Sequence, residues 1–113
     1  MKRDKTEIEK ITDCLIKFRD ERNWEQFHNS KDLALALSIE AAELNELFLW
    51  KGAEDVNVEK LKEELADVFI YALLLARKHQ FDVRDIVINK ITINKKKYPA
   101  AKAKNSARKY NEL

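Results

Sequence analysis

The chain has 113 residues, of which 45% are hydrophobic and 37% are charged, so we expect one folded domain rather than a disordered chain. A single glycine and a single proline are too few for the tight turns of an all-β protein, which favours an all-α fold. The net charge of +2 gives no general argument for nucleic-acid binding, and no apolar stretch is long enough to cross a bilayer.

The first helix is expected over residues 7–22, because Thr6 and Glu9 have the spacing of a capping box. Apolar residues follow at helical intervals, namely Ile8, Ile11, Leu15 and Phe18. Cys14 is the only cysteine, so no intrachain disulfide can form, and its place among these residues predicts a buried structural thiol. The charged segment 1–10 has no signal-peptide pattern, so we expect a cytoplasmic protein without membrane contact.

Residues 23–30 read as a connection with a short turn, ending in a helix cap at Asn29 or Ser30. Two helices are expected next, over residues 31–50 and, capped by Asn57, over residues 58–79. The first is apolar almost all round, and so are residues 69–76 of the second, a pattern typical of central helices. Because one small chain cannot easily cover so much apolar surface, we expect a homo-oligomer in which these helices also pack between subunits.

Asp82 can cap a fourth helix over residues 83–97, which ends because Tyr98 precedes Pro99. The tail, residues 100–113, is rich in lysine and arginine. The sequence thus predicts one domain over residues 1–113, a four-helix bundle with a basic C-terminal tail, in which residues 1–5 and 111–113 are flexible.

Two pairs of carboxylates, Glu40 with Glu43 and Glu64 with Asp67, are each spaced by three residues and so share one face of a helix. The short connection makes the two helices antiparallel and brings Glu43 level with Glu64, and Glu40 level with Asp67. Four carboxylates that converge need a cation or raised pKa values, and an oxygen-only ligand set suits Mg²⁺. The alternative is that all four lie on solvated helix faces.

The fourth helix carries Lys90, Asn94 and Lys97 on one face, which can hold phosphate oxygens or be an ordinary exposed surface. Beside a carboxylate–Mg²⁺ cluster, such a stripe suits a triphosphate. Several aromatic residues could form a core or a flat slot for a base, namely Trp24, Phe27, Trp50 and Tyr71. Glu25 and His28 form one E-x-x-H motif, but the second motif that a di-iron centre needs is missing.

Five segments together resemble the MazG-like all-α nucleoside triphosphate pyrophosphohydrolase superfamily, and within it the dCTP pyrophosphatase branch. They are spread over roughly residues 20–111 in the family's order: Trp24–His28, Glu40–Trp50, Glu63–Tyr71, Lys90–Pro99 and Ser106–Tyr110. The link between the two carboxylate motifs is shorter here than is usual in that branch.

The resemblance implies Mg²⁺, with Mn²⁺ as a substitute, held by four residues that are also catalytic: Glu40, Glu43, Glu64 and Asp67. It implies hydrolysis of a nucleoside triphosphate, dCTP or a modified dCTP, to the monophosphate and pyrophosphate, with one glutamate as the general base. It places the substrate against Trp24, His28, Trp50, Tyr71, Lys90, Asn94, Lys97 and Tyr98. Neighbouring subunits of the family build the site together, as a dimer or tetramer.

Two other functions stay open from the sequence. The apolar helix pair and the basic tail also fit a non-catalytic helical module that binds nucleotides or a partner protein. Nucleic-acid binding through residues 95–109 is the weaker of the two, because the basic residues there are few.

Overall fold

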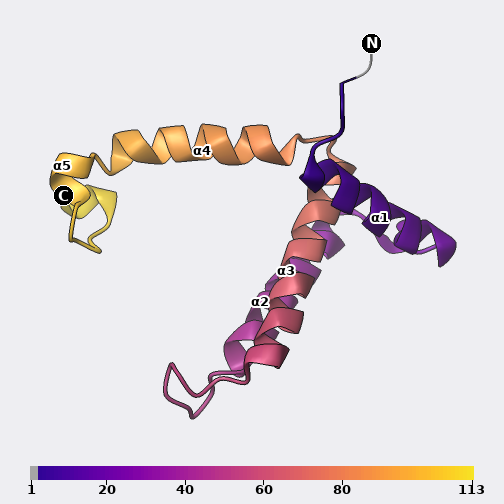
Figure 1. Ribbon diagram of the computed structural model, residues 1–113, viewed down its shortest axis with the longest axis horizontal. Helices are drawn as coiled ribbons and strands as arrows, with labels where there is room; N and C mark the ends of the chain where they lie inside the picture. Colours follow the sequence, from indigo (N-terminus) through magenta and orange to yellow (C-terminus); the bar gives the residue numbers. More distant parts are fainter. Residues whose placement is uncertain (1–2) are drawn as a thin grey trace. The chain divides into compact units, whose positions relative to one another are not determined.

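The computed structural model describes residues 3–113, and every regular element in this part of the chain is helical (Figure 1). The elements are α1 (Glu7–Glu21), the 3-10 turn η1 (Glu25–Phe27), α2 (Ser30–Glu46), α3 (Val58–Lys78), α4 (Val83–Lys97), α5 (Ala100–Ala103) and the 3-10 turn η2 (Tyr110–Glu112). The predicted all-α class is therefore confirmed. Between residues 3 and 113, no helix is long and apolar enough to cross a membrane.

The chain separates into two compact units, one that ends at Phe81 and one that begins at Asp82. The first contains α1, α2 and α3, and the second contains α4 and α5. The sequence predicts that these two units act as a single domain, and this stays a prediction. The flexibility of residues 1–5 and 111–113 also stays a prediction, and residues 1 and 2 lie outside the described part of the chain.

Each of the four long helices begins at a side-chain cap that the sequence indicates. A side-chain oxygen of each cap accepts a hydrogen bond from the backbone N–H three residues on, at 2.9 to 3.2 Å. The caps are Thr6, Asn29, Asn57 and Asp82. Of the two candidates for α2, the cap is thus Asn29. Such a cap typically contributes about 1 kcal/mol to helix stability, which explains why the helix starts are readable from the sequence.

The end of α2 differs from the prediction, because the helix stops at Glu46 rather than at Trp50. The backbone N–H groups of Leu47, Phe48 and Leu49 donate to carbonyls three residues back, at 3.3, 3.1 and 3.0 Å. Trp50 then has a φ of 63°, in the left-handed region, which ends the helical path. The apolar run up to Trp50 keeps a helical pattern, so the sequence does not reveal this tighter turn.

Helices α2 and α3 form an antiparallel hairpin, and α1 packs on α3 (Figure 1). The α1–α3 contact includes an ion pair in which Arg77 donates to Asp13 at 2.7 Å, and Lys5 also donates to Asp13. The start of α2 is joined to the end of α3 by a hydrogen bond of 2.8 Å between Ser30 and His79. Side-chain contacts therefore fix all three helices of the first unit to one another.

The buried apolar core of the described residues is small and consists of Leu33, Leu74 and Ala76. Large apolar side chains of the α2–α3 hairpin stay exposed, among them Leu35 at 56% and Phe69 at 61%. An exposed apolar surface of this kind is typical of a face that meets another molecule.

Cys14 is exposed, so the prediction of a buried structural thiol is wrong. Thr12 is the buried residue of α1, and its hydroxyl donates to the Ile8 carbonyl at 2.7 Å. Two residues further along, a helix has turned by about 200°, so Cys14 projects away from the buried side of α1.

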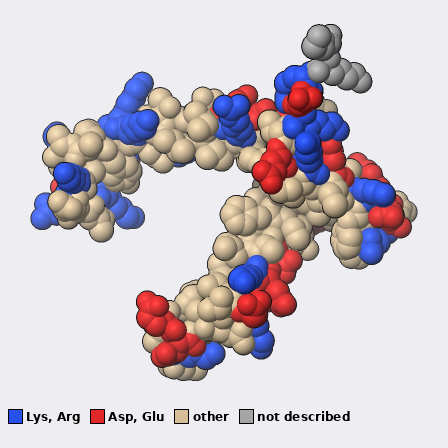
Figure 2. Space-filling model, viewed as in Figure 1, with Lys and Arg blue, Asp and Glu red and all other residues tan. Residues whose placement is uncertain are grey.

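In the second unit, the tail returns to the end of α4. Tyr98 and Tyr110 meet edge to face with ring centroids 6.2 Å apart, and Lys97 Nζ lies 5.0 Å from the Tyr110 ring centroid. No residue of α4 is buried, and its last turn carries three consecutive lysines, Lys95–Lys97. Figure 2 shows lysine and arginine side chains on the part of the surface formed by α4 and α5.

Candidate metal centre and adjoining pocket

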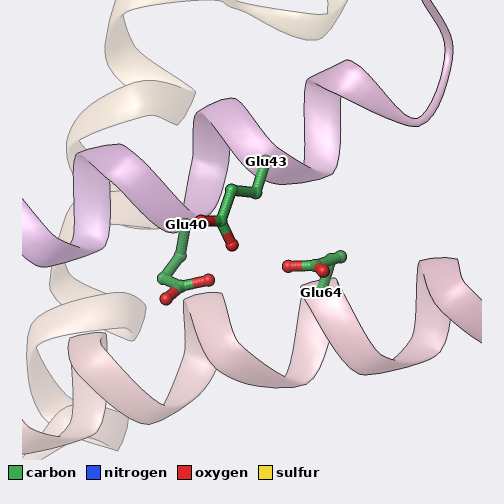
Figure 3. Close-up of side chains that lie close together, drawn as sticks. All are labelled: Glu40, Glu43 and Glu64. Carbon is green, nitrogen blue, oxygen red and sulfur yellow. The ribbon is translucent and has the colours of Figure 1, made fainter.

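Three carboxylates of the α2–α3 hairpin converge. Glu40 and Glu43 come from α2 and Glu64 comes from α3, and all three point toward one another (Figure 3). Each offers one carboxylate oxygen, and these oxygens lie within 4.8 Å of one another. Glu43 and Glu64 lie at nearly equal distances along the chain from the connection, so antiparallel packing brings them level, and Glu40 lies about one turn from Glu43 on the same face of α2.

Asp67, the fourth predicted ligand, does not belong to this close group. Its charge nevertheless acts on Glu40 and Glu64, so it lies near them. An aspartate side chain is one methylene shorter than a glutamate side chain, and Asp67 stands almost one helical turn beyond Glu64. The structure thus gathers three of the four predicted carboxylates and leaves Asp67 at the edge of the group.

The proximity of the carboxylates raises their pKa values. Burial, then a hydrogen bond with Glu43 and the charges of Glu43, Asp67 and Glu64, raise the pKa of Glu40 to about 7. Burial, followed by the charges of Glu43 and Asp67, also raises the pKa of Glu64. Without a cation, full ionisation of the cluster is therefore unfavourable, because the carboxylates repel one another.

Two oxygens of the cluster have no partner within the described residues. Oε2 of Glu40 and Oε2 of Glu64 are shielded from solvent and make no hydrogen bond. A buried carboxylate oxygen without a partner is costly, and a cation would offset that cost. Mg²⁺ holds its ligands at about 2.1 Å, so two of them lie at most about 4.2 Å apart, close to the spacing here. The residues present therefore fit a hard divalent cation.

A cavity of about 560 Å³ adjoins the carboxylates in the first unit. It is formed by α1, α3 and the segment between α1 and α2, and Asp67 belongs both to its wall and to the carboxylate region. Its lining is mainly apolar, with a few polar groups, and consists of Ile11, Cys14, Leu15, Phe18, Arg19, Trp24, His28, Asp67, Ile70, Tyr71 and Leu74. Its size and composition are those of a small-molecule site.

Three of the side chains predicted to contact the substrate, Trp24, His28 and Tyr71, line this cavity. Nδ1 of His28 is shielded from solvent and has no hydrogen-bond partner among the described residues. Burial and the nearby charge of Arg19 lower the pKa of His28, which favours a neutral imidazole. Burial, with the charges of Glu40, Asp67 and Glu43, raises the pKa of Tyr71.

The other predicted substrate contacts lie elsewhere. The side chain of Trp50 is 93% exposed at the turn after α2 and is not part of the cavity wall. The remaining four belong to the second unit, on α4 and at its C-terminal end: Lys90, Asn94, Lys97 and Tyr98. Their roles stay predictions.

The contribution of α1 to the cavity was missed from the sequence. Ile11, Leu15 and Phe18 line it, together with Cys14 and Arg19. Their helical spacing predicts only a core stripe, because a pattern of apolar residues does not distinguish a core from a cavity wall. The connection between residues 22 and 30 is short and therefore keeps Trp24 near α1. This was the sequence feature that could have indicated the contribution of α1 to the cavity.

Comparisons with known proteins identify the family of the chain. The model of the MazG-like family matches residues 35–113. The dCTP pyrophosphatase 1 of Homo sapiens is 42% identical over 94% of this chain and 67% of its own length, and that of Mus musculus is 39% identical over the same shares. The crystal structure of a pyrophosphatase from Archaeoglobus fulgidus is also similar, with a TM-score of 0.76 and 36% identity over 88% of this chain and 98% of that one. The chain belongs to the MazG-like family.

Proposed function

We propose that this chain is a Mg²⁺-dependent nucleoside triphosphate pyrophosphohydrolase that converts dCTP or a modified dCTP to the monophosphate and pyrophosphate. The observation that carries the proposal is the group of three converging carboxylates beside a cavity lined by aromatic side chains. The hydrolase class is supported by relatives that are dCTP pyrophosphatases and by a similar structure that is a pyrophosphatase.

The carboxylates have two tasks in this reaction. Glu40, Glu43 and Glu64, with Asp67 at the edge, would hold the metal ion, and Mn²⁺ would be an alternative to Mg²⁺. When bound, the ion supplies charge neutralisation for the phosphates and lowers the pKa of water. A cluster carboxylate accepts the proton of the attacking water, whose oxygen bonds to the α-phosphorus while the bond to the pyrophosphate oxygen breaks.

The cavity provides the site for the nucleoside. Trp24 and Tyr71 offer aromatic surfaces for the base, and the unpaired Nδ1 of neutral His28 can hydrogen-bond a polar group of the base. Because Asp67 lines the cavity near the carboxylate group, a nucleotide with its base in the cavity would have its phosphates near the metal ligands. Trp50, Lys90, Asn94, Lys97 and Tyr98 are proposed to complete the binding of the substrate.

We propose further that the chain forms a homo-oligomer, a dimer or a tetramer. The exposed apolar side chains of α2 and α3, among them Leu35, Ile39 and Phe69, support this because a monomer would leave them in water. The cytoplasmic location, the absence of membrane contact and the low affinity for nucleic acid are retained as predictions from the sequence.

A chromatographic product assay tests the activity. The purified protein is incubated with each of the eight common nucleoside and deoxynucleoside triphosphates and with 5-methyl-dCTP, with Mg²⁺ or with a chelator. The proposal expects monophosphate and pyrophosphate only with Mg²⁺, with dCTP or its 5-methyl form turned over fastest. Diphosphate with orthophosphate would contradict attack at the α-phosphorus. Nucleotide binding without any product would favour the alternative, a non-catalytic helical module.

A further inference from the structure

The segment that carries Trp24 and His28 is tied to the last turns of α1. The backbone N–H of Trp24 donates to the Arg19 carbonyl at 3.1 Å, and the Trp24 ring meets Phe18 edge to face with centroids 5.6 Å apart. The Arg22 guanidinium lies 3.9 Å from the Phe18 ring centroid and 5.9 Å from that of Trp24. One wall of the cavity is therefore built on the C-terminal end of α1.

Arg19 is unusual among the charged residues of this region because its side chain is only 14% exposed. Its guanidinium pairs with Asp20 at 2.8 Å and with Glu25 at 3.3 Å. These carboxylate partners are much more exposed, at 52% and 64%. The Arg19 side chain thus passes along the cavity wall before its charged end meets Glu25, the first residue of η1.

We propose that Arg19 is a positioning residue for nucleotide binding, which holds η1 against α1 so that Trp24 and His28 face the cavity. The inference rests on the proposed function, since the cavity is taken as the nucleoside site. A planar guanidinium can meet two carboxylates at once, whereas a lysine ammonium acts as a single point charge on a flexible stem. Arg19 also brings positive charge beside His28, which favours the neutral imidazole there.

Steady-state kinetics with dCTP and Mg²⁺ test the positioning role. Because the Glu25 partner is exposed, we expect Arg19→Met to raise KM by roughly threefold to tenfold and to change kcat by less than about twofold. Glu25→Gln should raise KM in the same way but less, and the double variant should resemble Arg19→Met alone. Arg19→Lys should raise KM less than Arg19→Met does. Lys17→Met, on the exposed side of the same helix, is the matched control and should be unchanged.

A spectroscopic measurement separates this inference from the proposed function. In a Trp50→Phe background, Trp24 is the only tryptophan, and its quenching by acrylamide reports its exposure. Arg19→Met should increase that quenching while the helical circular-dichroism signal stays intact. If the wild type has no turnover, the proposed function fails and this quenching still decides the positioning role. The inference would be overturned if Arg19→Met changed neither the quenching of Trp24 nor KM. It would also be overturned if kcat and the helical signal fell equally in Arg19→Met, Arg19→Lys and Glu25→Gln.

Discussion

Glu40 on α2 and Glu64 on α3 bring carboxylate oxygens within 4.8 Å of one another, and each also has an oxygen that is shielded from solvent and makes no hydrogen bond to the described residues. Two unpaired buried oxygens in one acidic group are unfavourable unless protons or a cation compensate them. This relationship links the antiparallel register of the hairpin to the chemistry of the proposed site.

Mg²⁺ should stabilise the protein through this group. At a free concentration about ten times Kd, binding adds about 1.4 kcal/mol, which corresponds to a rise in Tm of about 5 °C or more for a chain of this size. Glu64→Gln should lose this rise and, without metal, should be at least as stable as the wild type because one repelling charge is gone. Thermal unfolding followed by circular dichroism measures both.

The control for this experiment is Glu59→Gln in the first turn of α3. Among residues 3–113, Glu59 makes only an exposed ion pair with Lys62, at 3.3 Å, so the Mg²⁺-dependent rise should persist. An equal rise in Glu64→Gln and the wild type would place the metal elsewhere.

Glu40 should make the metal-free protein less stable as the pH rises. Its pKa is about 7 in the folded state, above the ordinary value of 4.5 for a glutamate, so the folded state retains a proton that the unfolded state loses. The contribution is fully present below pH 4.5 and is lost as the pH rises through 7. Urea unfolding in chelator, from pH 4.5 to 8, should show the wild type losing stability relative to Glu40→Gln.

The comparison with Glu40→Gln is needed because His28 acts in the opposite direction. Its pKa is lowered in the folded state, so its contribution to stability is lost as the pH falls. Both proteins contain His28, and the difference between them isolates Glu40. A difference in the free energy of unfolding that does not change between pH 4.5 and 8 would rule out the raised pKa.

The ion pair between Asp13 and Arg77 should contribute to stability at neutral pH. Hydrogen bonds from Lys5 and then Arg77 lower the pKa of Asp13, so its contribution is present above pH 3.8 and is lost as the pH falls through the folded-state pKa. Asp13→Asn should lower Tm at pH 7 and should lower it less at pH 3. Glu21→Gln, an exposed change on the same helix, serves as the control, and an equal decrease in Tm at both pH values would refute the charge-based explanation.

The exposed apolar face should mediate self-association. Phe69 is 61% exposed on α3, so Phe69→Asp removes an apolar contact without disturbing a buried side chain. Light scattering coupled to size exclusion should show an oligomer for the wild type and a smaller species for the variant. A monomeric wild type at micromolar concentration would contradict the proposed assembly.

Much of the fold follows from local signals in the sequence. Thr6, Asn57 and Asp82 mark helix starts because a cap and its N–H partner are only three residues apart. The end of α2 could not be predicted in this way, since Trp50 adopts a left-handed conformation that its residue type does not favour. Likewise, Cys14 lies in an apolar pattern, and only the packing of α1 on α3 shows that it is exposed.

For the candidate site, the sequence was informative where two helices share a simple register. Counting residues from the connection was enough to predict that Glu43 and Glu64 lie close together. The cavity depends instead on α1, whose position is determined by contacts between distant residues such as Asp13 and Arg77. Such contacts have no signature in sequence spacing, so Arg19 was not recognised.

The rate of dCTP hydrolysis by Glu43→Gln, compared with Glu46→Gln, tests the central claim most directly. Both residues lie on α2 and both are exposed, but only Glu43 belongs to the carboxylate group. With saturating Mg²⁺ and an intact helical signal, the account predicts at least about a hundredfold loss for Glu43→Gln and near wild-type turnover for Glu46→Gln. Wild-type turnover by Glu43→Gln would contradict the assignment of this group as the metal centre of the enzyme.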